Sequence, residues 1–404
     1  MSARQAAAGA LALAVVLCAG IWLGGHPNDL PGPLRDALVS ESTAINAEAS
    51  AVIEDNYYRR VGGRELTNGS IDGMVQAVRR RHRDRFSHYL TPENLARFNE
   101  SLSGRFTGVG LTVSEVDRGL RVGQVIRGAP ASRAGIAVGD VIVSVNGRSI
   151  AGLDADVATA RIKGPAGTTV RVGVLRPSEG TTRAVTLTRE EISLPITGSR
   201  IVEHDGHRLG YVSLFTFSDQ AARALRRATQ RVERRGAEGL VIDLRGNGGG
   251  LLRQAVLTSS IYLPRGKVVV STRSRTEGST VYRTVGDPLP PRPIVVLINR
   301  DTASAAEILA SALADNGAAK TVGTRSFGKG VFQQVIDLSN GGALDLTVGE
   351  FFTADGISLA GRGIRPDVRA FDDPRTAPDE ALETALGVLA GEVGSPPGPS
   401  AVSG

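Results

Sequence analysis

From about residue 208 the chain alternates short apolar strands with helical segments, and this pattern constrains the fold more than any other feature. The expected elements are a strand over 208–217, a helix over 218–235, the strand GLVIDL, a glycine-rich loop, a helix over 251–262, the strand PIVVLIN and a helix over 303–315. Runs such as VVLIN have no polar face, so these strands must be buried on both sides. The sequence therefore predicts an α/β core in which helices cover a sheet.

The segments that flank this core show different patterns of apolar residues and glycines. Residues 34–104 show helical apolar spacing, whereas 105–190 consist of short strands and glycines. Within the core, SNGG between two alternating strands predicts a hairpin over 331–352, and a short helix is expected over 378–390. The predicted parts are a signal anchor and spacer (1–33), a helical N-terminal region (34–104), a β-rich domain (105–190), a core (191–376), and a C-terminal helix with a disordered tail (377–404).

Residues 5–25 are uncharged, follow Arg4, and are long enough to cross a bilayer as a helix. No A-x-A cleavage site follows, and the residues before Cys18 lack the small side chain of a lipoprotein signal. We favour an uncleaved signal anchor over a cleaved signal. The protein is then a single-pass protein of the cell membrane with its catalytic domain outside the cytoplasm, or is secreted if cleavage occurs. Because Cys18 is the only cysteine, no internal disulfide can form.

The chain carries a net charge of +6, and nearly all of its basic residues are arginines, with 43 arginines and four lysines. Arginines gather in VRRRHRDR (78–85) and in the helix over 218–235, where they alternate with acids or lie on polar helical faces. We interpret both as solvated surfaces rather than as nucleic-acid sites. The first is also suited to anionic lipid beside the anchor.

Most familiar catalytic arrangements are absent from the sequence. None of the five histidines lies beyond His207, and there is no G-x-S-x-G motif, so the core cannot build a serine–histidine triad from its own residues. There is no H-E-x-x-H motif, and we expect no metal. The GNGGG loop lacks the G-K-[ST] closure of a phosphate cradle, and we expect no cofactor.

A serine–lysine pair remains. Ser304 follows the buried strand VVLIN at the start of a helix, where unpaired N–H groups gather. Lys329 lies in SFGKG, and if 329–334 is extended, alternation places Lys329, Val331 and Gln333 on one face and turns Gln334 away. Taken singly, such residues are usually a helix cap, a surface turn and a solvated glutamine. A lysine can act as a base only if its pKa falls well below the ordinary value of about 10.4.

The combination of segments resembles the carboxyl-terminal processing proteases, also called tail-specific proteases. The matching segments are NRDTASAAEI, FGKG, RDRFSHYLTPE (83–93), VIDLRGNGGG (241–250) and DGISLAGRGIRPDV (355–368). The resemblance implies a crotonase-like ββα core with an inserted PDZ domain. It also implies that Ser304 is the nucleophile, Lys329 the general base and Gln333 the partner that orients Lys329. The oxyanion is then held by the backbone N–H groups of Ala305 and, by preference, Gly249.

The β-rich domain carries GVGL followed by GAPASRAGIAVGDVIVSVNGRSI (128–150), which resembles a PDZ domain of the circularly permuted bacterial kind. Its peptide-binding residues are expected to be Gly108, Val109, Gly110 and Leu111. The two glycines free the backbone to form a nest for a C-terminal carboxylate, and the next strand offers an edge to the peptide. Lys163 stands where relatives often carry an arginine, so a gating role is not carried over.

We therefore expect a serine endopeptidase that captures flexible protein C-termini through its PDZ domain and cleaves exported or envelope proteins near their tails. The expected partners are those tails, the membrane through the anchor, and a second copy in a homodimer. A non-catalytic adaptor and a lipid or retinoid carrier on the same core are alternatives that the complete serine–lysine pair disfavours. In a chain that avoids lysine, Lys329 also marks a position where a removable proton is useful.

Overall fold

The computed structural model describes residues 41–103, 105–153, 155–193, 195–372 and 377–394. They form two compact units, divided between Thr91 and Pro92. The predicted signal anchor and spacer at 1–33 lie outside the described residues. Within the described ranges, no helix combines the length and the apolar character needed to cross a bilayer.

The first unit is mainly helical. It contains α3 (Glu41–Asn56), α4 (Gly63–His82) and the short strand β1 (His88–Leu90). Helix α4 ends where Arg83 adopts the left-handed conformation, with φ of 54°. The hydroxyl of Tyr89 donates a hydrogen bond to Oδ1 of Asn68 at 2.7 Å, which ties β1 to α4.

The second unit opens with α5 (Pro92–Ser103), and a β-rich domain follows. Its strands and helices are β2 (Arg105–Gly108), β3 (Leu111–Val116), β4 (Gly119–Val125), α6 (Pro130–Arg133), β5 (Val141–Val145), β6 (Arg148–Ser149), α7 (Ala155–Ile162), β7 (Thr169–Arg176), β8 (Thr181–Thr188) and β9 (Glu190–Ser193). The main antiparallel sheet has the order β3-β4-β5-β7-β8, with β6 paired to β5. Strand β3 therefore lies at an edge, as the peptide-binding strand of a PDZ domain must.

The core domain contains the predicted strand–helix alternation. Its elements are β10 (Thr197–His204), β11 (His207–Leu214), α8 (Ala221–Glu233), β12 (Gly239–Asp243), α9 (Leu252–Ser259), β13 (Val268–Ser274), β14 (Gly278–Arg283), β15 (Ile294–Ile298), α10 (Ala305–Asp315), β16 (Lys320–Gly323), β17 (Val331–Asp337), β18 (Ala343–Phe352), β19 (Val368–Arg369) and α11 (Glu380–Val393). The main sheet has the order β10-β11-β12-β15-β16-β19. The pairs from β11 to β19 are parallel, and β10 pairs antiparallel to β11.

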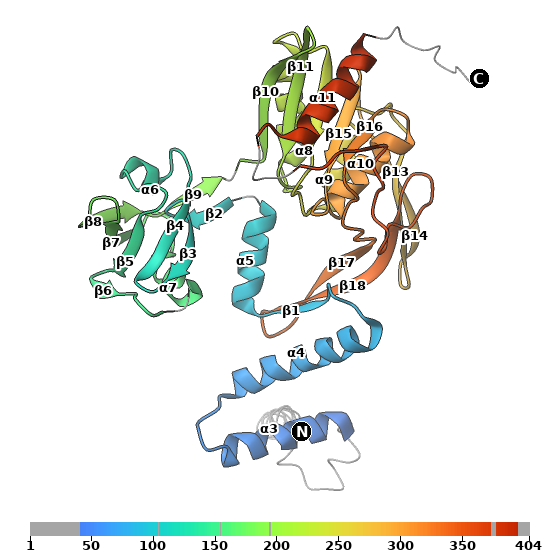
Figure 1. Ribbon diagram of the computed structural model, residues 1–404. Helices are drawn as coiled ribbons and strands as arrows, with labels where there is room; N and C mark the ends of the chain where they lie inside the picture. Colours follow the sequence, from blue (N-terminus) through green and yellow to red (C-terminus); the bar gives the residue numbers. More distant parts are fainter. Residues whose placement is uncertain (1–40, 104, 154, 194, 373–376, 395–404) are drawn as a thin grey trace, which may run out of the picture. The chain divides into compact units, whose positions relative to one another are not determined.

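Both faces of this sheet are covered, as the apolar strands predicted. On one face, Ile242, Val296 and Ile298 join the buried side chains of α8, α9 and α10. On the other face, Val241 and Val295 pack with the apolar side of α11, which crosses the sheet in red in Figure 1. Successive residues of β12 and β15 therefore point alternately into two separate hydrophobic cores. Both faces of these strands are buried, which explains why the stretches 240–242 and 294–298 are entirely apolar.

The predicted hairpin over 331–352 is confirmed, since β17 and β18 pair antiparallel around the SNGG turn. Strand β18 also pairs with β13, and β13 pairs with β14, so these strands form a second sheet. The register of the hairpin shifts between Phe332 and Gln333. This irregularity affects which side chains reach the candidate site.

Candidate active site

Ser304 lies immediately before α10 in a conformation that non-glycine residues rarely adopt, with φ of 55° and ψ of −120°. Such a backbone persists only where its surroundings hold it. The N–H of Ser304 donates to Oε2 of Glu307 at 2.9 Å, and the N–H of Ala303 donates to the carbonyl of Asn247 at 2.9 Å. The sharp turn between β15 and α10 presents Ser304 at the first turn of a buried helix.

The structure brings Ser304, Ala305, Lys329 and Gln333 together around one cavity of about 370 Å³. These residues come from the start of α10, the loop before β17 and β17 itself, so the fold unites segments that are 25 or more positions apart. The rest of the lining is largely apolar and comes from α5, α9, α10, β13, the hairpin and the glycine loop: Phe98, Leu102, Gly248, Gly250, Leu251, Leu252, Thr272, Ile308, Phe332, Val335, Asp345 and Phe351. A peptide with apolar side chains fits such a lining.

Lys329 is half-buried, and burial lowers the pKa of its ammonium group, while the carboxylates of Asp345 and Glu307 act in the opposite direction. A lowered pKa is what a general base requires. The flanking glycines have a packing role, because the carbonyl of Gly328 accepts from the N–H of Gly361 at 2.9 Å and a Cβ on Gly330 would lie 2.1 Å from the nitrogen of Ala360. The glycine-flanked lysine is therefore part of a packed loop and not of a free surface turn.

Gln333 lies in the pocket and Gln334 is exposed, as predicted, but the alternation argument behind this prediction was wrong in part. Strand β17 begins at Val331, so Lys329 precedes the strand, and Val331 is not among the pocket residues. Near the register shift, Phe332 and Gln333 both reach the pocket, which strict alternation forbids. The side-chain amide of Gln333 donates from Nε2 to Oγ1 of Thr347 at 3.2 Å. Its role as the partner of Lys329 stays a prediction.

Glu307 is a residue of the site that the sequence reading missed. Its side chain is fully buried. Its carboxylate accepts hydrogen bonds from the backbone N–H groups of Ser304, Gly328 and Lys329 at 2.9, 2.8 and 3.0 Å. It also accepts one from the hydroxyl of Ser326 at 2.5 Å. One carboxylate thus joins the serine turn to the lysine loop. The sequence did indicate one of these contacts, because Ser304-x-x-Glu307 has the spacing of a capping box. Asp345 of β18, which lines the pocket, was also missed.

The glycine loop differs from our expectation at Gly249. Its N–H donates to Oδ1 of Asn247 at 2.9 Å, so in this conformation it is engaged within the loop and cannot also serve an oxyanion. Gly248 and Gly250 line the pocket instead, and neither N–H donates to another residue in the part of the chain that the structure describes. Gly249 still lies close to Ser304, because a Cβ there would stand 2.8 Å from Cβ of Ser304 and 2.9 Å from the nitrogen of Ala305.

In the β-rich domain, Gly108, Val109, Gly110 and Leu111 line a small cavity of about 50 Å³. The rest of its lining comes from β2, β3 and α7 and the residue that follows α7: Phe106, Thr107, Val113, Thr159, Ile162 and Lys163. Gly110 has φ of 83°, and a Cβ there would lie 2.2 Å from Cβ of Ala129, so only glycine fits. The cavity lies between the edge strand β3 and α7, and it carries one cationic side chain, that of Lys163.

Comparison with known proteins identifies both domains. Residues 208–370 match peptidase family S41, and residues 98–175 match the PDZ domain. The carboxyl-terminal-processing protease of Synechocystis is 31% identical over 405 aligned residues, which cover 95% of this chain and 93% of the relative. The carboxy-terminal processing protease CtpA of Bacillus subtilis is 33% identical and is covered over 66% of its length, so the chain spans slightly less than two thirds of that relative.

Solved structures agree with this assignment. The photosystem II D1 C-terminal processing protease is 30% identical, with a TM-score of 0.51, and the match covers 87% of this chain and 98% of that one. A mixed α/β core with an inserted PDZ domain and N-terminal helices is therefore the fold of this chain, as the sequence predicted. From these matches and from the site geometry, the chain belongs to peptidase family S41, among the carboxyl-terminal processing serine peptidases that carry a PDZ domain.

Proposed function

We propose that this chain is an endopeptidase in which Ser304 is the nucleophile and Lys329 is the general base. The observation that carries the proposal is that both side chains line one pocket, both backbones are held by the carboxylate of Glu307, and burial lowers the pKa of Lys329. A neutral amine at Lys329 can take the hydroxyl proton of Ser304. No imidazole is required.

The reaction follows from this geometry in two halves. The Ser304 oxygen attacks the peptide carbonyl as Lys329 removes its proton, and the ammonium then gives that proton to the leaving amine. The developing oxyanion is stabilised by the N–H of Ala305, at the positive end of α10, and by an N–H of the loop at Gly248 or Gly250. Water, deprotonated by the regenerated amine, then hydrolyses the acyl-enzyme.

The PDZ domain is proposed to capture the free C-terminus of a flexible protein chain. A peptide can add to the open edge of β3, and its last side chain can enter the cavity bounded by Gly108, Gly110 and Leu111. Lys163 lies at the same cavity and supplies positive charge for the terminal carboxylate. This arrangement favours cleavage near protein C-termini.

The protein is further proposed to be exported, held at the membrane by residues 5–25, and paired with a second copy through its N-terminal helices. The uncharged stretch after Arg4 supports the anchor. Exposed apolar side chains on α3 and α4, including Ile45, Val52 and Met74, support the pairing. Comparing the C-termini of exported proteins in cells with the wild-type chain and with Ser304→Ala tests where the substrates lie.

The catalytic proposal is tested with the purified variants Ser304→Ala and Lys329→Ala and with Lys267→Ala as a matched control. Lys267 is an exposed lysine outside the pocket. We expect both active-site variants to lose cleavage of a flexible substrate with an apolar tail while they keep the wild-type melting temperature, and we expect the control to cleave normally. Proteolysis retained by Lys329→Ala would disprove the serine–lysine mechanism.

A further inference from the structure

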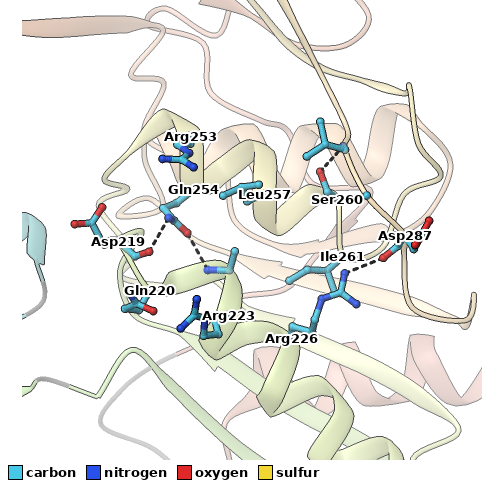
Figure 2. Close-up of a pocket in the computed structure, with 13 residues that line it drawn as sticks. Asp219, Gln220, Arg223, Arg226, Arg253, Gln254, Leu257, Ser260, Ile261 and Asp287 are labelled. Carbon is cyan, nitrogen blue, oxygen red and sulfur yellow. Dashed lines mark hydrogen bonds between the residues drawn. The ribbon is translucent and has the colours of Figure 1, made fainter.

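A second cavity, of about 590 Å³, lies on the core domain at the beginnings of α8 and α9, and it shares no lining residue with the pocket of Ser304. Figure 2 shows that its walls come from three segments: the first turns of α8, the length of α9 with the residues after it, and the loop 285–287. The catalytic proposal uses none of these residues.

Three arginines line this cavity: Arg223 and Arg226 from α8 and Arg253 from α9. The guanidinium groups of Arg223 and Arg253 form no ion pair or hydrogen bond with any residue that the structure describes. The guanidinium of Arg226 donates from Nη2 to the backbone carbonyl of Asp287 at 2.9 Å, which leaves its charge unneutralised. Arg223 is exposed, in agreement with the solvated face that the sequence pattern indicated for α8, and the fold places Arg253, an exposed residue of another helix, at the same cavity.

The cavity also carries two carboxylates, those of Asp219 and Asp287, so cations outnumber anions in its lining. In Figure 2 these aspartates lie at opposite edges of the view, with the arginines between them. Neither aspartate forms an ion pair with a described residue. An anion that enters the cavity therefore meets guanidinium groups that the protein itself has not paired.

Hydrogen bonds join the walls of the cavity to one another. Gln254 bridges the two helices, since its Nε2 donates to the carbonyl of Asp219 at 2.7 Å and its Oε1 accepts the N–H of Ala222 at 3.0 Å. The hydroxyl of Ser260 accepts the N–H of Val285 at 3.0 Å, which fixes the third wall. A ligand would find the cavity already formed, so binding requires little ordering of the protein.

The glycine loop of the active site leads directly into α9, and hydrogen bonds connect it to the segment that precedes α8. The N–H of Phe217, just before α8, donates to the carbonyl of Gly249 at 3.0 Å. The N–H of Leu251, just before α9, donates to the carbonyl of Phe217 at 2.9 Å. A ligand that contacts both α8 and α9 at this cavity would therefore connect the glycine loop with the segment that is hydrogen-bonded to it.

We propose that this cavity is an effector site for a phosphate group, bound by guanidinium groups that line it, and that its occupation steadies the glycine loop and raises the rate of peptide cleavage. Two or three guanidinium groups at one cavity match the several oxygens of a phosphate, which accepts paired N–H donors. Free pyrophosphate and the headgroup of an anionic phospholipid both offer this chemistry. The rate effect depends on the proposed peptidase function, whereas binding does not.

Binding is tested by titrating inorganic pyrophosphate into Ser304→Ala protein in a calorimeter, so that no catalytic activity is needed. We expect saturable binding that weakens as sodium chloride is added. Arg223→Gln and Arg253→Gln should each lower the affinity about tenfold, because each removes a charge-assisted contact. Arg227→Gln is the matched control: Arg227 is an exposed arginine of α8 outside the cavity, and its loss should change the affinity less than about twofold.

A second arm uses vesicles of phosphatidylglycerol with the same variants. Vesicle binding that requires Arg223 and Arg253 but not Arg227 supports the site and identifies lipid as the source of the phosphate. Absence of binding to both probes overturns the proposal, and so does equal weakening by Arg227→Gln, because the attraction would then be a property of the general surface charge.

The rate effect is measured with the active enzyme and a flexible peptide. Saturating pyrophosphate should raise kcat/KM about fivefold in the wild type and leave Arg223→Gln unchanged. An unchanged wild-type rate with pyrophosphate bound overturns the coupling to the glycine loop. If the wild-type chain has no peptidase activity at all, the proposed function is overturned. The calorimetric test of phosphate binding is unaffected by that outcome, because it uses the inactive Ser304→Ala protein.

Discussion

The buried carboxylate of Glu307 accepts the backbone N–H of Lys329 at 3.0 Å, and the same oxygen accepts the N–H of Ser304 at 2.9 Å. The proposed nucleophile and the proposed base are thus set by one side chain, although 25 positions separate them in the sequence. A change at Glu307 acts on both groups at once. The first prediction follows from this arrangement.

Glu307→Gln should lower kcat/KM about a hundredfold and destabilise the core by about 1–3 kcal/mol. The amide replaces one acceptor oxygen with a donor, so buried N–H groups lose their partner and the two loops shift relative to each other. Steady-state kinetics and urea unfolding measure the two effects. Ser326→Ala is the control, because it removes a single hydroxyl from the same carboxylate and should cost less on both measures. Wild-type kinetics in Glu307→Gln would contradict the positioning role.

Gly249→Ala should abolish most activity, with a loss of about a hundredfold or more in kcat/KM. The added Cβ would meet the carbonyl of Ala303 at 2.8 Å and the nitrogen of Ala305 at 2.9 Å, and φ of 98° disfavours alanine. The proposed oxyanion donor, the N–H of Ala305, must then move. Gly246→Ala is the control, because φ is also positive there but nothing lies within 4 Å, so only stability should fall. Equal activity of the two variants would argue against the close approach.

Asp345→Asn should move the acidic limb of the kcat/KM profile to lower pH. The carboxylate of Asp345 favours the protonated form of Lys329 and so raises its pKa, against the lowering effect of burial. Removing this charge lowers the pKa further, and the neutral amine is then present at more acidic pH. The pH dependence of kcat/KM for a short peptide measures the shift. A limb that stays in place, or moves to higher pH, would show that Lys329 is not the titrating base.

Amidation of the substrate's C-terminus should weaken capture by the PDZ domain, and Lys163→Gln should reduce the preference for the free carboxylate. Lys163 lies at the cavity of Gly108–Leu111 and offers a positive charge to the terminal carboxylate. Affinities of matched free and amidated peptides for the two proteins form a double-mutant cycle. We expect a preference of about tenfold or more in the wild type, and equal binding of both peptides would remove the proposed role of this domain.

Much of the site was predictable because short sequence patterns carry it. The buried strand VVLIN, the helix after it and the serine between them follow from apolar periodicity and helix-end chemistry. The hairpin follows from its SNGG turn, and the edge strand of the PDZ domain follows from GVGL and the segment after it. In each case the determining interactions are local.

The errors have a common cause. Alternation selected Gln333 correctly, but the register shift beside Phe332 and the late start of β17 were invisible, because they arise where two strands adjust to each other. The engagement of the Gly249 N–H by Asn247 depends on how one loop folds on itself. The anchor at residues 5–25 lies outside the described residues and stays a prediction.

The sequence by itself determined the fold class, the identity of the serine and lysine candidates, and the family, because these depend on periodicity and motif spacing. Only the tertiary structure decided that the carboxylate of Glu307 reaches the lysine loop, which N–H groups of the glycine loop remain available, and that Arg253 joins Arg223 and Arg226 at one cavity. These relationships join segments that are distant in the chain, so they exist only once the sheet and its helices have packed.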